Sequence, residues 1–271
     1  MNEYFVELCG LLFAGSGKPT EGLTYSRLEG WDGRPAVRSK TDVIPGWHGS
    51  YAHVAPLVSS PLMELTAAII AETREEFFRV KRRVESMPHV GLLRASRGDG
   101  VWSSQVEIQQ IRIPDWNGRT KTTFTIDLIA PDPVRYRDPV VLGPIGLPVQ
   151  SGGLVLPAAF PWNFGTSVRP AVTLVNDGAL PCWPVVRVSG SADHLTVTGG
   201  ARRVQVGPFD GVLVLDSRER RAWLNGGEVT RELLRRDWHE VAPGESARFS
   251  FDAVEPSPDL SLTVEYQIGA W

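Results

Sequence analysis

The sequence contains only two cysteines, Cys9 and Cys182, and they lie far apart in the chain. Two distant cysteines cannot form the disulfide framework of a small secreted domain, so a reducing compartment is the simpler expectation. The N-terminal residues include Glu3 and Glu7 where a signal peptide carries lysines, and the apolar run that follows is short. We therefore expect no secretory signal and a protein that is made in the cytoplasm.

The sequence also lacks long apolar runs and an excess of positive charge. No stretch approaches the roughly twenty apolar residues that cross a membrane, so we expect no membrane insertion. The net charge is -3, which offers no cationic field for nucleic acid. With 271 residues and 42% hydrophobic content, the chain can bury a sizeable core and is long enough for two domains.

Local motifs for phosphate or metal binding are absent as well. Residues 15–18 read Gly-Ser-Gly-Lys, but Leu12 and Pro19 stand where a phosphate-binding loop needs Gly and then Ser or Thr. His48 and His53 are five residues apart and have no strong third ligand nearby, so two loop histidines are the simpler interpretation. We predict no metal site and no cofactor.

No catalytic signature stands out. Ser217, Asp237 and His239 lie close in sequence, but no Gly-x-Ser-x-Gly elbow places a serine on a sharp turn. Two carboxylate pairs could serve glycoside hydrolysis, but acids are common at such turn positions, and the sequence cannot set the spacing of the carboxyl groups. These pairs are Asp210 with Asp216 and Glu240 with Glu245. We predict no catalytic residue and no enzyme.

What the sequence does contain is a series of short strands in its second half. In residues 260–268 apolar and polar side chains alternate, which predicts a strand with one buried face. Turn signals, such as Asn-Asp-Gly at 176–178 and Asn-Gly at 225–226, separate further strands. These strands are expected at residues 171–175, 184–188, 211–215, 222–224 and 247–251. Many short strands with polar turns predict an antiparallel β-sandwich.

The first half is predicted to be rich in strands around a single helix. The expected strands are residues 1–14, a hairpin over 23–43 that turns at 31–33, residues 62–70, and a long hairpin of 101–113 with 120–129. Thr73 and Glu76 form a capping-box pattern, and Pro88 ends the helix that follows. Its apolar stripe consists of Phe77, Val80, Val84 and Met87.

The remaining faces of this helix are basic and include Arg79, Arg82 and Arg83. A basic helical face can bind nucleic acid, but neighbouring glutamates dilute the charge and no aromatic side chain accompanies it on the exposed side. A solvated face or an ion-paired contact between subunits is the stronger interpretation. We predict no specific binding of nucleic acid and name the three arginines as candidates for a subunit interface.

A proline-rich connector separates the two halves. Residues 130–139 contain three prolines, which fix the backbone and prevent ladder hydrogen bonds. We therefore predict domains at 1–138 and 139–271. Residues 140–170 are expected to be mostly loop, with short edge strands at most.

Nine tryptophans offer candidate contacts for sugars. Trp162 and Trp183, both in the second domain, are the candidates for stacking on a glycan. Tryptophans buried in a sandwich core are more frequent than sugar platforms, so burial is the competing interpretation.

The order of the motifs resembles the siphophage distal tail protein family. The matching features include the turn signals of residues 176–251, the strand-to-helix passage of 65–77, and the strand that ends in Ala-Pro-Asp-Pro at 130–133. Together they cover most of residues 45–271, and they are turns and strand ends rather than a catalytic signature.

This resemblance implies two β-sandwich domains. The first would be similar to the tail-tube fold, with one flanking helix, and the second would be galectin-like, similar to a carbohydrate-binding module. It also implies a virion protein of the tail tip that forms a hexameric ring. Its partners would be the tail-tube protein, the tape-measure protein and the hub proteins of the tip or baseplate, and a host-surface glycan is a further candidate.

Two other functions are consistent with the residues. The first alternative is a carbohydrate-binding module protein that recognises surface glycans, and its binding would depend on an exposed tryptophan. The second is a glycan hydrolase or esterase, which the missing catalytic signature disfavours.

Overall fold

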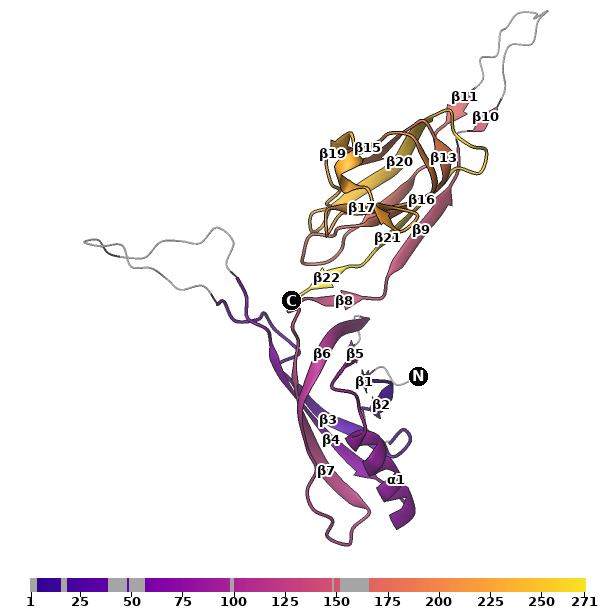
Figure 1. Ribbon diagram of the computed structural model, residues 1–271. Helices are drawn as coiled ribbons and strands as arrows, with labels where there is room; N and C mark the ends of the chain where they lie inside the picture. Colours follow the sequence, from indigo (N-terminus) through magenta and orange to yellow (C-terminus); the bar gives the residue numbers. More distant parts are fainter. Residues whose placement is uncertain are drawn as a thin grey trace, which may run out of the picture. The chain divides into compact units, whose positions relative to one another are not determined.

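The computed structural model describes residues 4–15, 19–38, 48, 57–97, 100–147, 149–151 and 166–271. The chain is mainly β with one α-helix, which confirms the predicted fold class (Figure 1). Contacts divide it into two compact units. Unit 1 comprises Met1–Asp138 together with Ala270–Trp271, and unit 2 comprises Pro139–Gly269.

Unit 1 is built on one nine-stranded sheet. In spatial order the strands are β22 (Gly269–Ala270), β8 (Arg135–Arg137), β6 (Val101–Arg112), β5 (Val90–Arg97), β1 (Tyr4–Leu8), β2 (Leu11–Ala14), β3 (Leu23–Glu29), β4 (Leu62–Ile70) and β7 (Lys121–Ile129). Because β6 also pairs with β7, part of this sheet is closed. The closed part consists of β6, β5, β1, β2, β3, β4 and β7, in that order. Closure satisfies the edges that an open sheet would leave unpaired.

Two predictions for the start of unit 1 are wrong. Residues 1–14 do not form one strand, because Cys9 and Gly10 adopt positive φ angles of 51° and 79° and turn the chain back as the hairpin β1–β2. Nor does β3 form a hairpin through residues 31–33. Its partner is β4, with Leu23 opposite Ile69 and Glu29 opposite Glu64, so the pairing is distant in sequence.

The predicted long hairpin exists only in part. β6 and β7 pair over Glu107–Arg112 and Thr125–Ile129. The first half of β6 pairs with β5 instead, and β7 pairs along its whole length with β4. Both strands are therefore paired with other strands of unit 1 along their length.

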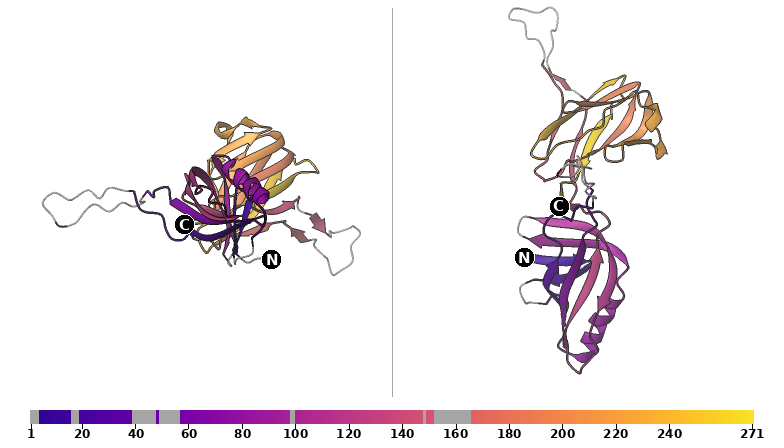
Figure 2. Two further views of the ribbon diagram at one scale, coloured as in Figure 1. Left: turned by 90° about the horizontal axis from the view of Figure 1, so that it is seen from below. Right: turned by 90° about the vertical axis from the view of Figure 1, so that its left-hand side faces the viewer.

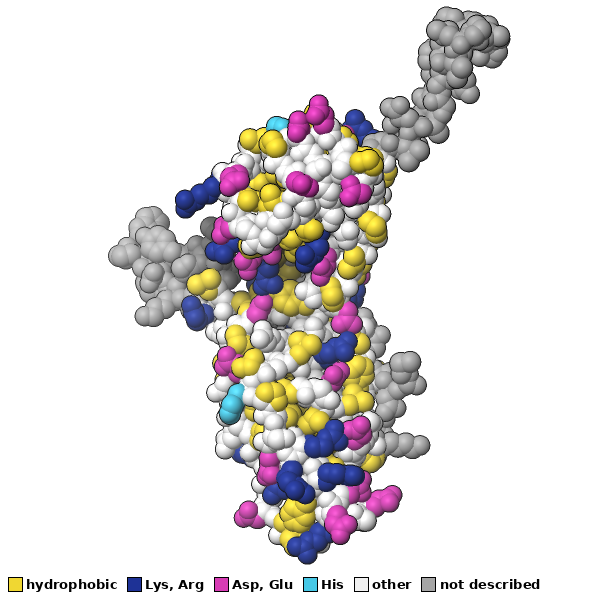
Figure 3. Space-filling view, turned by 45° about the vertical axis from the view of Figure 1, so that its right-hand side comes forward, with side chains coloured by type: hydrophobic (Ala, Val, Ile, Leu, Met, Phe, Trp, Pro, Cys, Tyr) yellow, Lys and Arg dark blue, Asp and Glu magenta, His cyan; other side chains and the backbone are white. Residues whose placement is uncertain are grey.

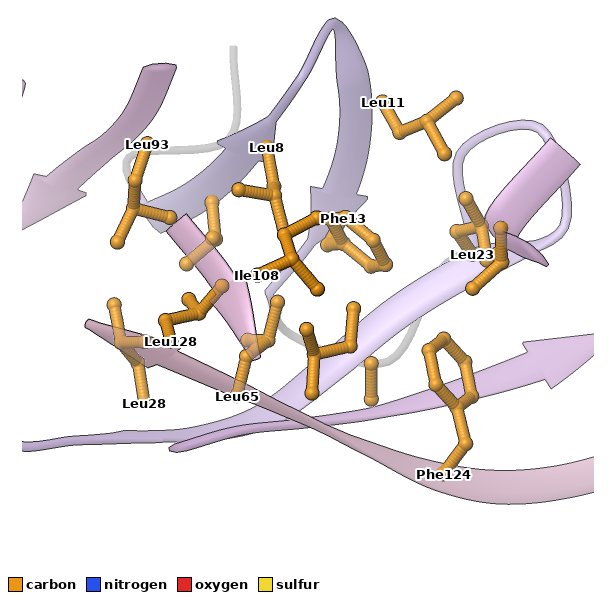
Figure 4. Close-up of a cluster of buried hydrophobic side chains, with 14 of the residues drawn as sticks. Leu8, Leu11, Phe13, Leu23, Leu28, Leu65, Leu93, Ile108, Phe124 and Leu128 are labelled. Atoms are coloured by element: carbon orange, nitrogen blue, oxygen red, sulfur yellow. The ribbon is translucent and has the colours of Figure 1, made fainter. Parts of the chain in front are cut away.

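The core of unit 1 lies inside the closed sheet. Alternate residues of each strand point inward, which is the period-two pattern expected of half-buried strands. Figure 4 shows how side chains from β1, β2, β3, β4, β6 and β7 meet there. Phe13 and Phe124 lie with ring centroids 6.5 Å apart, and fully burying such a ring stabilises the fold by about 1.5–3 kcal/mol.

The helix α1 (Arg74–Glu85) begins as predicted but ends at Glu85, so Met87, which was expected on its apolar stripe, lies after the helix and packs against the core partly buried. The Thr73 hydroxyl accepts a hydrogen bond from the Glu76 amide at 3.2 Å, while a carboxylate oxygen of Glu76 accepts one from the Glu72 amide at 3.0 Å. The helix buries Phe77, Val80 and Val84 in the core cluster of unit 1. Its arginines are therefore left on the solvent side.

Unit 2 contains two larger sheets that form a sandwich (Figure 2). The five-stranded sheet has the order β12 (Val172–Val175), β20 (Ser246–Val254), β14 (His194–Gly199), β15 (Arg202–Val206) and β19 (Arg235–Arg236). The six-stranded sheet has the order β18 (Gly227–Glu228), β17 (Arg221–Leu224), β16 (Phe209–Asp216), β13 (Val185–Ala192), β21 (Ser261–Tyr266) and β9 (Val140–Ile145). The short strands β10 (Val149–Ser151) and β11 (Thr166–Val168) pair separately, and a 3-10 turn covers Thr230–Glu232.

The six strands predicted in the second half are present, as β12, β13, β16, β17, β20 and β21. In β21, Leu262, Val264 and Tyr266 are buried and alternate with half-buried polar residues, as the pattern predicted. Asn225 and Gly226 adopt φ angles of 49° and 85° in the turn between β17 and β18, as expected for Asn-Gly. The strands β9, β14 and β15 had not been predicted as clear elements.

Candidate interaction surfaces

The candidate subunit interface on α1 is exposed, but its charges have partners within the chain. Arg83 lies 2.7 Å from the Glu21 carboxylate, and Arg79 lies 3.8 Å from that of Glu76. The Arg82 guanidinium donates to the carbonyl oxygen of Phe78 at 3.2 Å. Lys and Arg side chains are interspersed with Asp and Glu on the face that Figure 3 shows. Exposed ion pairs of this kind contribute about 0–1 kcal/mol, so these arginines remain available to a partner.

An arginine and two aromatic rings join α1 to the loop between β6 and β7. The Arg74 guanidinium lies 4.3 Å from the ring centroid of Trp116, and the rings of Trp116 and Phe78 are 5.5 Å apart. The Trp116 indole also donates to the carbonyl oxygen of Arg119 at 2.9 Å. Cation–π contacts at exposed sites contribute about 0.5–1 kcal/mol. This cluster has no signal in the sequence, because no local pattern pairs a helix residue with a distant loop.

A cavity of about 380 Å³ lies within unit 1, at the end of β3 and the start of β4. Its walls include Trp31, Leu62, Met63, Ala130 and Trp271. Arg135 lies over the ring of Trp31 and donates to the carbonyl oxygens of Trp31 and Gly33, while Arg34 lies over Trp271. Because apolar side chains form much of the wall, the cavity suits an apolar group better than a charged one.

Only one of the two candidate sugar-binding tryptophans is in the described part of the chain. Trp183 is 39% exposed and follows the buried Cys182, whose backbone pairs with that of Val241. Trp162 lies outside the described residues. A third ring, Trp223, is half-buried in β17 directly opposite Val214 and Glu228.

The residues considered for a catalytic triad do not form one. Ser217 and His239 are each 1% exposed, and neither the serine hydroxyl nor either ring nitrogen has a hydrogen-bond partner. Asp237 instead pairs with Arg235 at 3.5 Å. Burial lowers the pKa of His239 to about 4, so the ring is neutral near pH 7. A serine that does not contact its base cannot be activated by it.

Two of the four carboxylates considered for glycoside hydrolysis have structural roles. One carboxylate oxygen of Asp216 accepts the backbone amides of Arg218 and Glu219 at 2.8 and 2.9 Å, which fixes a turn. Glu240 pairs with Arg202 at 3.1 Å. Glu240 and Glu245 both line an open cavity of about 330 Å³, which Arg202 also lines.

Within the described residues, no group of three His, Cys, Asp or Glu side chains could hold a metal ion. His48 is exposed, and His53 lies outside the described part of the chain. No helix in the described ranges is both long and apolar enough to cross a membrane.

No protein-family model matches this sequence, and no curated protein matches it either. The comparison with solved structures is different. The crystal structure of the SPP1 Dit protein, described as a paradigm of the hub adsorption apparatus in phages that infect Gram-positive bacteria, superposes with a TM-score of 0.66. The match covers 98% of each chain at 13% identity. The chain has the Dit fold.

A second match has the same character. A chain in the phage P2 baseplate, in its activated conformation with Ca, superposes with a TM-score of 0.51 over 97% of each chain at 7% identity. The resemblance to distal tail proteins that the sequence motifs predicted is thus confirmed at the level of the fold. The likeness includes both units, because almost the whole of each chain is matched.

Proposed function

We propose that this chain is a structural protein at the tip of a long, non-contractile phage tail. The observation that carries the proposal is the match to SPP1 Dit, which spans 98% of both chains. A partial match would support a shared domain only, whereas this one includes both units in the same order. Fold alone does not specify function. Two further observations support the proposal independently. The sequence motifs resemble those of the distal tail family, and Ser217, Asp237 and His239 do not form a catalytic triad.

In the proposed role, copies of the chain form a ring, hexameric as in the family it resembles. The ring joins the tail tube to the tip or baseplate and to the receptor-binding apparatus, next to the tape-measure and hub proteins. Unit 1 is the tail-tube-like, ring-forming domain, and unit 2 is the galectin-like domain. The basic face of α1, with Arg79, Arg82 and Arg83, is one proposed subunit contact. The role requires assembly and no turnover of a substrate.

Electron microscopy of the purified protein, combined with size-exclusion chromatography and light scattering, tests this function. We expect closed rings and a mass that is a fixed multiple of the monomer. Antibody labelling of virions should place the protein at the tail tip. A compact particle that stays solitary at high concentration and is absent from virions would contradict the proposal.

The exposure of Trp183 supports a second candidate, a module that binds surface glycans. An exposed indole can stack on the apolar face of a sugar. A glycan array tests this with the wild type, Trp183→Ala and Trp162→Ala, and binding that neither substitution lowers would exclude these two rings. Chromogenic glycosides and esters test for hydrolysis, for which we expect no turnover.

A further inference from the structure

One flank of unit 1 carries an exposed apolar strip on β5. Val90 and Leu92 are two residues apart on the outer face of this strand, and they are 49% and 48% exposed. Glu107 of β6 is exposed and lies directly opposite Val90. The strip therefore presents apolar side chains beside a carboxylate.

A second apolar surface adjoins the cavity of unit 1. Leu62, at the start of β4, is 73% exposed and lines the cavity. Leu57 is 63% exposed, and its carbonyl oxygen accepts the amide of Arg38 at 2.7 Å, so the two residues lie opposite each other. Arg38 is exposed. This surface, called the socket, presents apolar side chains and a hollow beside a guanidinium.

The strip and the socket lie on different sides of the closed sheet. Between β5 and β4 the sheet passes through β1, β2 and β3 in one direction and through β6 and β7 in the other. The two surfaces therefore do not cover each other within unit 1 of one copy. A contact between a strip and a socket therefore requires two copies.

We propose that the strip of one copy docks into the socket of the next. Exposed apolar side chains gain free energy when a partner covers them. The charges beside the two surfaces are opposite, since Glu107 accompanies the strip and Arg38 accompanies the socket. A contact between two different surfaces of identical chains is head-to-tail, and repeating it by a rotation that closes gives a ring. The inference rests on the proposed function, because it names the contact that would build that ring.

Two substitutions separate the halves of this contact. Leu62→Asp damages the socket and leaves the strip intact, while Leu92→Asp damages the strip and leaves the socket intact. Because every contact needs one strip and one socket, we expect each variant alone to be monomeric. An equimolar mixture should give a dimer that cannot extend, since only one productive contact is available. Leu234→Asp is the matched control, because Leu234 is 58% exposed and lies in unit 2, and it should leave the oligomer unchanged.

The charge complementarity has its own test in the mixed dimer. Glu107→Arg is added to the Leu62→Asp chain, which supplies the strip, and Arg38→Glu to the Leu92→Asp chain, which supplies the socket. Either change alone should raise the dissociation constant about tenfold through like-charge repulsion. Both together should restore it. Circular dichroism and the melting temperature of each variant establish that it is folded.

The outcomes distinguish the contact from the function. A wild-type ring that Leu62→Asp and Leu92→Asp both leave intact would overturn the strip–socket contact and keep the ring. A dimer formed by the Leu62→Asp variant alone would show a symmetric strip–strip contact and also overturn the proposal. A monomeric wild type at the highest soluble concentration would overturn both the ring and its contact.

Discussion

The side-chain amide of Asn176 donates to the carbonyl oxygen of Val241 at 2.9 Å, although the two residues are far apart in the chain. The same amide donates to the Leu180 carbonyl at 2.9 Å, and the side-chain oxygen accepts the Gly178 amide at 3.1 Å. Asn176 is fully buried. One side chain thus holds the turn after β12 against the segment that precedes β20.

Replacing Asn176 should destabilise unit 2. Asn176→Ala removes three hydrogen bonds, so we expect a loss of about 3 kcal/mol at about 1 kcal/mol per bond. Asn176→Asp should also be destabilising, because a carboxylate cannot donate to the carbonyls of Leu180 and Val241. Urea denaturation measures the loss. Asn117→Ala, in an exposed loop, is the control, and an equal loss there would contradict this account.

His239 should make the protein less stable in acid. Its folded pKa is lowered to about 4, mainly by burial, whereas the unfolded residue titrates near 6.5. The unfolded chain therefore binds the extra proton first as the pH falls. The contribution of this group to stability is intact above pH 6.5 and is lost progressively down to pH 4, where the loss reaches about 3 kcal/mol.

The variant His239→Leu isolates this effect. Leucine keeps an apolar side chain against Phe249, whose ring centroid lies 5.2 Å from that of His239, and it cannot bind a proton. The difference in unfolding free energy between variant and wild type should therefore move in favour of the variant as the pH falls from 6.5 to 4. A difference that does not change with pH would contradict the assignment, because all other groups titrate in both proteins.

Two glycines near the cavity form a matched pair for a test of backbone packing. Gly30 and Gly33 both have positive φ angles, 72° and 96°. A Cβ at Gly30 would lie 2.1 Å from the Leu62 carbonyl oxygen, while a Cβ at Gly33 would meet nothing within 4 Å. Both alanine variants should pay the cost of positive φ. Gly30→Ala should lose about 2 kcal/mol more through the clash, as urea denaturation would show. Equal losses would contradict this.

Reversing the charges on α1 tests the proposed basic contact. The triple variant with Arg79, Arg82 and Arg83 each replaced by Glu should weaken the oligomer, which light scattering at falling protein concentration would detect. The control is a triple Arg→Glu variant of unit 2 at the exposed positions Arg220, Arg231 and Arg236, which has the same change in net charge. An oligomer that survives the first variant as well as the second would remove α1 from the interface.

Local patterns in the sequence predicted elements well where the cause is itself local. The start of α1 follows from the side chains of Thr73 and Glu76, and its buried face follows from an apolar stripe within one helix. The buried face of β21 follows from alternation within a few residues. In both cases the residues that decide the structure are neighbours in the chain.

The errors arise where the partner is distant. A turn signal at residues 31–33 predicted a hairpin, but β3 pairs with β4, and no local signal identifies that partner. The strands β14 and β15 show alternation, with Leu195 and Val197 buried in the first, but the polar residues and glycines around them resemble a loop. The cluster of Arg74 with Trp116 and the role of Asn176 likewise depend on contacts that only the folded chain brings together.

The chain passes from unit 1 to unit 2 after Asp138 and returns at Ala270, where β22 completes the edge of the nine-stranded sheet beside β8. During synthesis a ribosome delivers this edge strand only after all of unit 2 has emerged. Unit 1 therefore lacks its last strand for as long as unit 2 is being synthesised. A fragment that ends at residue 138 would lack β22 permanently. Separate production of the two halves would need β22 to be supplied in trans or grafted behind β8.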